Sequence, residues 1–125
     1  MFLNIRFTAK TSDNLSKGLM FSEPLEKNEC AFFIFSYLDS HSFWNKNVNF
    51  PICLLFLDEN FQIRDIGKLQ AHQEKPCRSE YPFVKYVIEG HADLPIENDI
   101  QINDYCLPEN DKIKIIKGKR KISKN

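Results

Sequence analysis

The stretch Ile52–Leu57 (ICLLFL) decides the fold class of this chain. It contains six apolar residues, fewer than an ordinary buried helix needs, and a turn-forming group follows it at 58–60 (DEN). A short, continuous apolar run that ends in a turn is typical of a strand covered on both faces of its sheet. Because Asn60 tolerates the left-handed backbone of a tight hairpin, we expect the chain to return as a second strand.

Similar extended segments are expected along most of the chain. They show either short apolar runs or alternation of apolar with polar residues. They lie at about 3–7, 31–35, 43–44, 52–57, 61–66, 84–88, 99–107 and 112–115. One short helix is expected at 13–19, where Thr11 and its neighbours offer capping oxygens and Leu15 and Leu19 share a face. Residues 68–82 are polar with two prolines and form the longest expected loop. The sequence therefore predicts a mostly β protein.

The size of the chain fits a single domain, with 125 residues and no net charge. The charges are unevenly placed, since residues 108–125 carry +5 and residues 1–107 carry −5. Asn4 and Arg6 interrupt the apolar N-terminus, so we expect neither a signal peptide nor a transmembrane segment. The expected location is cytoplasmic, with association with a virion or another assembly as the alternative.

The four cysteines are 23, 24 and 29 residues apart, and no pair has Cys-x-x-Cys spacing. Spacing therefore gives no zinc site, and each cysteine lies in or beside an apolar run, where a free thiol is ordinarily buried. A disulfide is the alternative. The chain has only four glycines, so a phosphate-binding loop or a dinucleotide fingerprint is excluded, and we expect no cofactor and no metal.

Six short motifs, in this order, resemble the pattern of the family called domain of unknown function 192. They are KGLM at 17–20, FFIF at 32–35, FWNKN at 43–47, PICLLFLD at 51–58, YVIE at 86–89 and IQIND at 100–104. The resemblance covers about residues 1–107 and implies a compact antiparallel β-sandwich or barrel-like domain with one short helix and no agreed activity. Residues 108–125 then form an extension with a last strand and a basic tail.

The chain departs from that family pattern at four positions. Asn45 stands where the family has Met, Val48 where it has Thr, Cys53 where it has a strand Asp, and Asn103 where it has Gly. An activity that depends on the strand Asp is therefore expected to be absent here.

Trp44, Lys46 and Asn47 form the first candidate ligand site. On a strand, Trp44 and Lys46 would share one face, and Asn45 and Asn47 would share the other. An exposed aromatic ring beside a cation and an amide can stack on and hydrogen-bond a sugar, a base or a peptide. The alternative is that Trp44 belongs to the core or its rim and the aliphatic stem of Lys46 covers it.

Glu89 and His91 are two residues apart on an expected strand, and therefore on one face. They could act as an acid/base pair. The alternative is a structural role, in which Glu89 binds backbone donors or pairs with Lys46 or Arg64 in a buried network.

The basic tail offers Lys117, Lys119, Arg120 and Lys121 to a partner. Nucleic acid, an acidic protein or anionic lipid would bind such a segment by charge. The alternative is a solvated end that keeps the protein soluble.

These observations favour a module that binds an unidentified small molecule or protein, with Trp44, Lys46, Asn47 and Glu89 as the candidate site. A structural or accessory subunit of a larger, for example viral, assembly is one alternative. An enzyme with a site around Lys46, Asn47, Glu89 and His91 is the other. The sequence does not define the oligomeric state.

Overall fold

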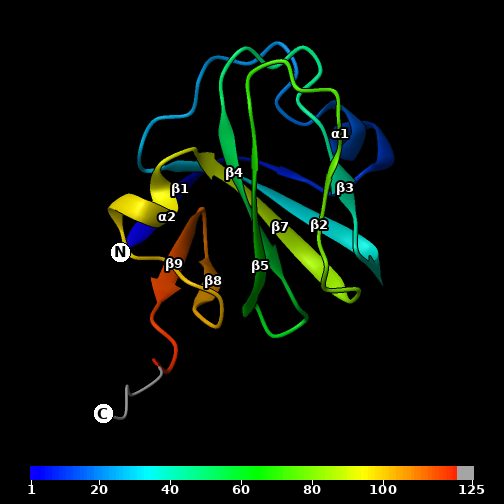
Figure 1. The fold of residues 1–125 in the computed structure, drawn as a ribbon. Coiled ribbons are helices and arrows are strands. Elements are labelled where there is room, and N and C mark those ends of the chain that lie inside the picture. Colours follow the sequence, from blue (N-terminus) through cyan, green and yellow to red (C-terminus); the bar gives the residue numbers. More distant parts are fainter. Residues whose placement is uncertain (121–125) are drawn as a thin grey trace, which may run out of the picture.

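A seven-stranded sheet, curled into a half-barrel, forms the body of the protein in a computed structural model that describes residues 1–120 (Figure 1). Its strand order is β5-β4-β7-β2-β1-β9-β8. These strands are β1 (Phe2–Ala9), β2 (Glu29–Asp39), β4 (Ile52–Leu57), β5 (Ile63–Leu69), β7 (Val84–His91), β8 (Tyr105–Glu109) and β9 (Lys112–Ile116). The remaining elements are a separate two-stranded ribbon of β3 (Ser42–Phe43) and β6 (Cys77–Arg78), and two short helices, α1 (Ser12–Lys17) and α2 (Leu94–Glu97).

The structure confirms the prediction of a mostly β, barrel-like fold. β1 and β2 pair in parallel, and the other ladders of the sheet are antiparallel. The predicted helix is α1, and the predicted long loop contains the end of β5 and all of β6. β9, from the predicted extension, lies inside the sheet between β1 and β8.

Two apolar clusters cover the two faces of the sheet. One lies inside the curl and includes Ile63 and Cys106 from the two edge strands, together with Leu94 of α2. The other lies on the outer face, where Phe33 and Leu54 pack and Leu15 of α1 covers them in part. All six residues of β4 are buried, because β4 has an apolar cluster on each side. The two helices therefore cover opposite faces (Figure 1).

The two edges of the sheet meet near Asp104. A bridge joins Gln62, just before β5, to Tyr105 of β8. The N–H of Ile63 donates to the carbonyl of Asp104 at 2.7 Å, and the N–H of Asn103 donates to the carbonyl of Ile63 at 2.8 Å. These bonds close one end of the half-barrel.

The four cysteines are free thiols, and Cys30, Cys53 and Cys106 are buried. Burial raises the pKa of Cys30 and of Cys53 to about 12, so neither thiol is activated as a nucleophile. Within residues 1–120, no helix combines the length and apolarity that crossing a membrane requires.

Candidate functional site

A cavity of about 610 Å³ lies between α1 and the outer face of the sheet. Its walls come from α1 and the turn after it, the end of β2, β3, the segment after β3 (Trp44, Asn45 and Val48), and single residues of β6 and β7. Cavities of roughly 300–1,000 Å³ are typical of small-molecule sites. This is the larger of the two hollows described for residues 1–120.

Gly18 ends α1 where the chain passes close to the sheet. Its φ of +48° ends the helix, and a side chain at this position would be strained. A Cβ there would lie 3.7 Å from the ring of Phe33 and 3.8 Å from Oε1 of Glu89. The chain then continues to Leu19, which is buried in the outer cluster. The turn therefore brings the backbone close to the sheet immediately beside the Glu89 carboxyl.

The end of β2 supplies one wall because it leaves the sheet. The ladder between β2 and β7 is regular as far as Ile34 and resumes only at Asp39, with a shift of register between them. Phe35 and Tyr37, which lie in this irregular stretch, line the cavity. Tyr37 is 59% exposed, so this wall reaches the opening of the cavity.

Glu89 forms the floor of the cavity. It is buried, and its carboxyl makes no hydrogen bond or salt bridge with any described residue. Burial raises the pKa of Glu89 to about 8. The network with Arg64 that the sequence suggested does not form, because Arg64 pairs with Asp58 at 3.1 Å and stacks on Tyr81.

Several aromatic rings line the cavity together with Glu89, among them Phe35, His41 and Phe43. Phe43 makes edge-to-face contacts with Phe33 and Phe35, with ring centroids 5.3 and 6.0 Å apart. His41 stacks on Phe35 at 3.6 Å, and its Nε2 lies 3.2 Å from the carbonyl of Tyr37. Burial lowers the pKa of His41, so its ring is neutral near pH 7.

Asn45 is a polar residue of this wall that the sequence did not identify as a site residue. It is 1% exposed, and its Nδ2 donates to the carbonyls of Phe50 at 3.1 Å and Gln70 at 2.9 Å. These two bonds fix the orientation of the amide and leave Oδ1 without a donor among the described residues. The FWNKN motif contains this residue, but the prediction from sequence assigned ligand binding to its neighbours Trp44, Lys46 and Asn47.

Three cations line the outer part of the cavity. Arg78 forms a salt bridge with Asp39 at 3.4 Å and donates a hydrogen bond to Ser40 Oγ at 2.5 Å. Lys10 and Lys17 form no salt bridge with any residue in the described part of the chain. The outer part of the cavity therefore has two uncompensated positive charges.

The structure brings Trp44 and Glu89 to this cavity, whereas Lys46 and Asn47 are not part of its lining. Trp44 is 44% exposed, and Nζ of Lys46 lies 5.4 Å from the centroid of its ring, as in the alternative interpretation. Asn47 adopts a left-handed turn with φ of 59°, and its carbonyl accepts from the N–H of Phe21 at 2.9 Å. Because this segment is a turn and not a strand, side chains do not alternate there as expected.

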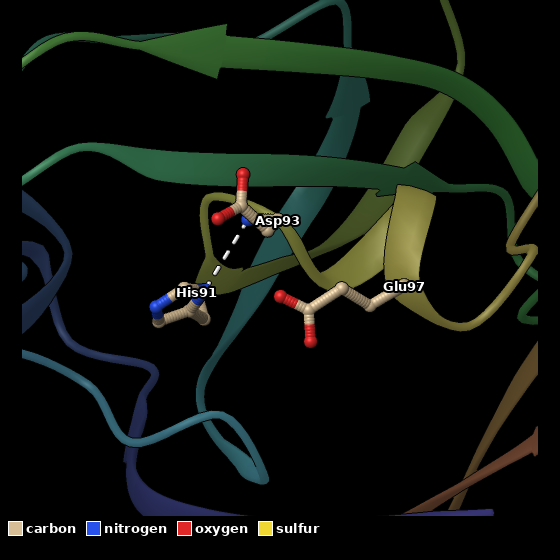
Figure 2. Close-up of side chains that lie close together, drawn as sticks. All are labelled: His91, Asp93 and Glu97. Carbon is tan, nitrogen blue, oxygen red and sulfur yellow. Dashed lines mark hydrogen bonds between the residues drawn. The ribbon is translucent and has the colours of Figure 1, made fainter.

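His91 opens onto a second, smaller hollow of about 280 Å³ that Glu89 does not line. Figure 2 shows His91 with Asp93 and Glu97, whose potential metal-binding atoms lie within 4.8 Å of one another. Nδ1 of His91 accepts from the N–H of Asp93 at 3.2 Å, and Glu97 pairs with Lys27 at 3.3 Å. Both acids are exposed and surface groups of this kind are common, so we assign no metal to them.

Part of the basic tail folds back onto the protein. Nζ of Lys117 donates to the carbonyls of Asn98, at 2.7 Å, and Asp99. Arg120 pairs with the buried carboxylate of Asp104 at 2.5 Å. Lys119 is exposed, and Lys121 lies outside the described residues.

Comparisons with known proteins agree with the fold and assign no activity. The model of the family DUF192, described as "Uncharacterized ACR", matches residues 4–106. A protein of unknown function from Novosphingobium aromaticivorans is similar in structure, with a TM-score of 0.74 and 26% identity over 81% of this chain and 73% of that one. A Sinorhizobium meliloti protein described as a "putative transcription regulator" has a TM-score of 0.77 and 25% identity over 82% of this chain and 79% of that one. No curated protein matches the chain.

Proposed function

Because the chain belongs to the DUF192 family, which is uncharacterised, we propose its function from the geometry of its cavity: it is a binding domain for a small molecule that occupies the space between α1 and the sheet. One observation carries this proposal. A buried carboxyl, Glu89, forms the floor of a cavity of ligand size and has no partner among the described residues.

The energetic cost of Glu89 supports a ligand. Burying a carboxyl without a hydrogen-bonding partner is unfavourable, and an apolar residue at the same place would avoid that cost. The neighbours of Glu89 across the ladders are Ala31 and Leu54, both buried and apolar. A polar contact supplied by a ligand would offset the cost and explain why this strand carries an acid.

The origin of the lining residues supports the same proposal. Gly18, Leu19 and Met20 come from the first motif that resembles the family, Trp44 from the third, and Glu89 from the fifth. These segments are far apart in the chain and meet at one cavity.

The same geometry favours binding over catalysis. The enzyme hypothesis required Lys46, Asn47, Glu89 and His91 to converge, and only Glu89 lines the cavity. His91 belongs to the second hollow, so Glu89 has no acid/base partner from that set.

A fragment library screened by NMR on the labelled protein tests the proposal. We expect ligands that shift the amide resonances of Gly18, Trp44 and Glu89 together. Ser16→Trp, which places a bulky ring in the cavity wall, should abolish this binding. Asn14→Trp is the matched control, because Asn14 is exposed on the same helix and does not line the cavity. Binding that survives Ser16→Trp, or a library without a hit at these residues, would contradict the proposal.

A further inference from the structure

We propose that the ligand of this cavity is a small zwitterion, with an ammonium group bound at Glu89 and a carboxylate bound at Lys10 and Lys17. This inference rests on the proposed function and names the class of ligand.

The inner end of the cavity lacks donors. The carboxyl of Glu89 has no donor among the described residues, and the ionised carboxylate can only accept. An ammonium group carries three donors and a positive charge, so it complements this carboxylate.

The aromatic rings of the lining favour a cation in the same cavity. Phe35, Phe43 and Trp44 line the cavity together with Glu89. Phe33 is fully buried and is not part of the lining. Aromatic rings beside a carboxylate attract an ammonium group through the negative charge of the ring faces.

The outer end has the opposite charge. Lys10 and Lys17 have no acidic partner among residues 1–120, whereas Arg78 is already paired with Asp39. Two uncompensated cations would repel a simple amine as it enters and would attract a carboxylate. The hydroxyl groups of Ser12 and Ser16 lie in the same part of the lining and can donate to that carboxylate.

Binding of the ammonium group moves one proton. In the empty cavity Glu89 is largely protonated at neutral pH, because burial raises its pKa to about 8. When an ammonium group binds, the Glu89 carboxyl releases its proton to solvent and becomes the carboxylate of the ion pair. Affinity should therefore rise with pH up to the pKa of Glu89.

Three matched probes test the inference by isothermal titration calorimetry and NMR. They are 4-(aminomethyl)benzoate, 4-methylbenzoate, which lacks the amine, and 4-methylbenzylamine, which lacks the acid. We expect the zwitterion to bind about tenfold or more tightly than either control, because each end adds a partly desolvated ion pair. Its affinity should rise between pH 6 and pH 8.5.

Variants of the protein test which residues bind the ammonium group of the zwitterion and which bind its carboxylate. In Glu89→Gln the zwitterion should bind no better than 4-methylbenzoate, and its pH dependence should vanish. In the double variant Lys10→Gln/Lys17→Gln it should bind no better than 4-methylbenzylamine. Lys46→Gln is the charge control, because Lys46 is exposed beside Trp44 outside the lining, and affinity should not change.

The pH dependence must come from Glu89 and not from its surroundings. The other titratable or charged groups that face it from the cavity walls or from β4 behind it are Lys10, Lys17, Asp39, His41, Cys53 and Arg78. Asp39 is ionised and His41 neutral over pH 7–8.5, and Cys53, with a pKa of about 12, stays protonated. If the affinity of Glu89→Gln for the zwitterion still rises with pH, the inference is therefore overturned.

The outcomes separate the inference from the proposed function. If 4-methylbenzoate or 4-methylbenzylamine binds in the cavity as tightly as the zwitterion, the ligand class is wrong and the binding function stands. If no probe and no library fragment binds in the cavity, both the ligand class and the proposed binding function are wrong. If Glu89→Gln does not fold, the ligand class is still tested by the three probes on the unmodified protein and by the double lysine variant.

Discussion

At the scale of single residues, Glu89 occupies a place where its cross-strand neighbours, Ala31 and Leu54, are apolar. Its carboxyl ionises easily in the unfolded chain, where its pKa is near 4.5, and reluctantly in the folded protein, where burial raises the pKa to about 8. The unfolded state therefore loses its proton first as pH rises. The contribution of Glu89 to stability is complete below pH 4.5 and decreases until about pH 8.

Glu89→Gln should remove this pH dependence. The free energy of unfolding of the variant, relative to the natural protein, should rise between pH 4 and pH 8 by about 4–5 kcal/mol at most. Urea unfolding followed by circular dichroism at several pH values measures the difference. A constant difference between the two proteins across this range would show that Glu89 ionises normally in the fold.

Gly18→Ala should destabilise the protein by about 1–3 kcal/mol, because its φ of +48° and ψ of −128° suit glycine alone. The added Cβ would meet Phe33 and Glu89 only at ordinary contact distances, so the loss comes from the backbone and not from a clash. Thermal unfolding measures it, with Ser16→Ala in the same helix as the control. An unchanged stability would mean that the end of α1 adjusts freely.

Sequence reasoning proposed Trp44 and Glu89 as ligand-binding residues, because a lone tryptophan and an acid inside an apolar strand are visible without a structure. It added Lys46 and Asn47 because they are neighbours of Trp44 in the chain. The structure places Trp44 and Glu89 in the cavity lining and Lys46 and Asn47 outside it, and their roles in binding stay predictions. The left-handed backbone at Asn47 turns the chain, which periodicity cannot reveal. Asn45 was not proposed as a site residue, because an assumed strand places it on the face opposite Trp44, whereas the structure has no strand at this position.

At the scale of elements, apolar runs in the sequence predicted strands well, whereas the two-residue strand β6 left no recognisable pattern. β4 and β7 were predicted from their own residues because both are covered by apolar clusters. β6 was predicted as loop, since its residues, Cys77 and Arg78, form a strand only by pairing with β3. α2 has four residues and contributes Leu94 to the inner cluster, and its amphipathic pattern is too short to recognise.

The irregular end of β2 is the element that opens the cavity wall. Deleting Ser36 and Tyr37 should shorten the stretch between Ile34 and Asp39, where β2 and β7 change register. We expect a more regular ladder, a smaller cavity and at least a tenfold loss of probe affinity, with the protein still folded. Hydrogen exchange at the amide of Lys85 measures the regularity of the ladder, and calorimetry measures the probe affinity. An unchanged affinity would show that the end of β2 does not contribute to the site.

At the scale of the whole molecule, Asp104 joins the sheet edges to the C-terminal segment. Its carboxylate accepts from the N–H of Gln101 and of Gly118, each at 2.8 Å, and from Arg120. Burial alone would raise its pKa, but these hydrogen bonds outweigh burial and lower the pKa to about 2. The stabilisation is therefore present above pH 3.8 and is lost as pH falls toward 2.

Asp104→Asn should remove this stabilisation, on the order of 2 kcal/mol at pH 7. The difference in unfolding free energy between the two proteins should shrink as pH falls from 5 to 2. Denaturant unfolding at each pH provides the measurement, and Asp111→Asn, an exposed acid, is the control. A difference that stays constant in acid would mean that Asp104 is not ionised in the fold.

The position of β9 has a consequence for biosynthesis. β1 pairs on one side with β2 and on the other with β9, which ends at Ile116. A ribosome therefore synthesises all of the chain between β1 and β9 before β1 can gain its second neighbour. Until then the nascent chain exposes the unpaired edge of β1 beside an open apolar interior, the kind of surface that chaperones protect.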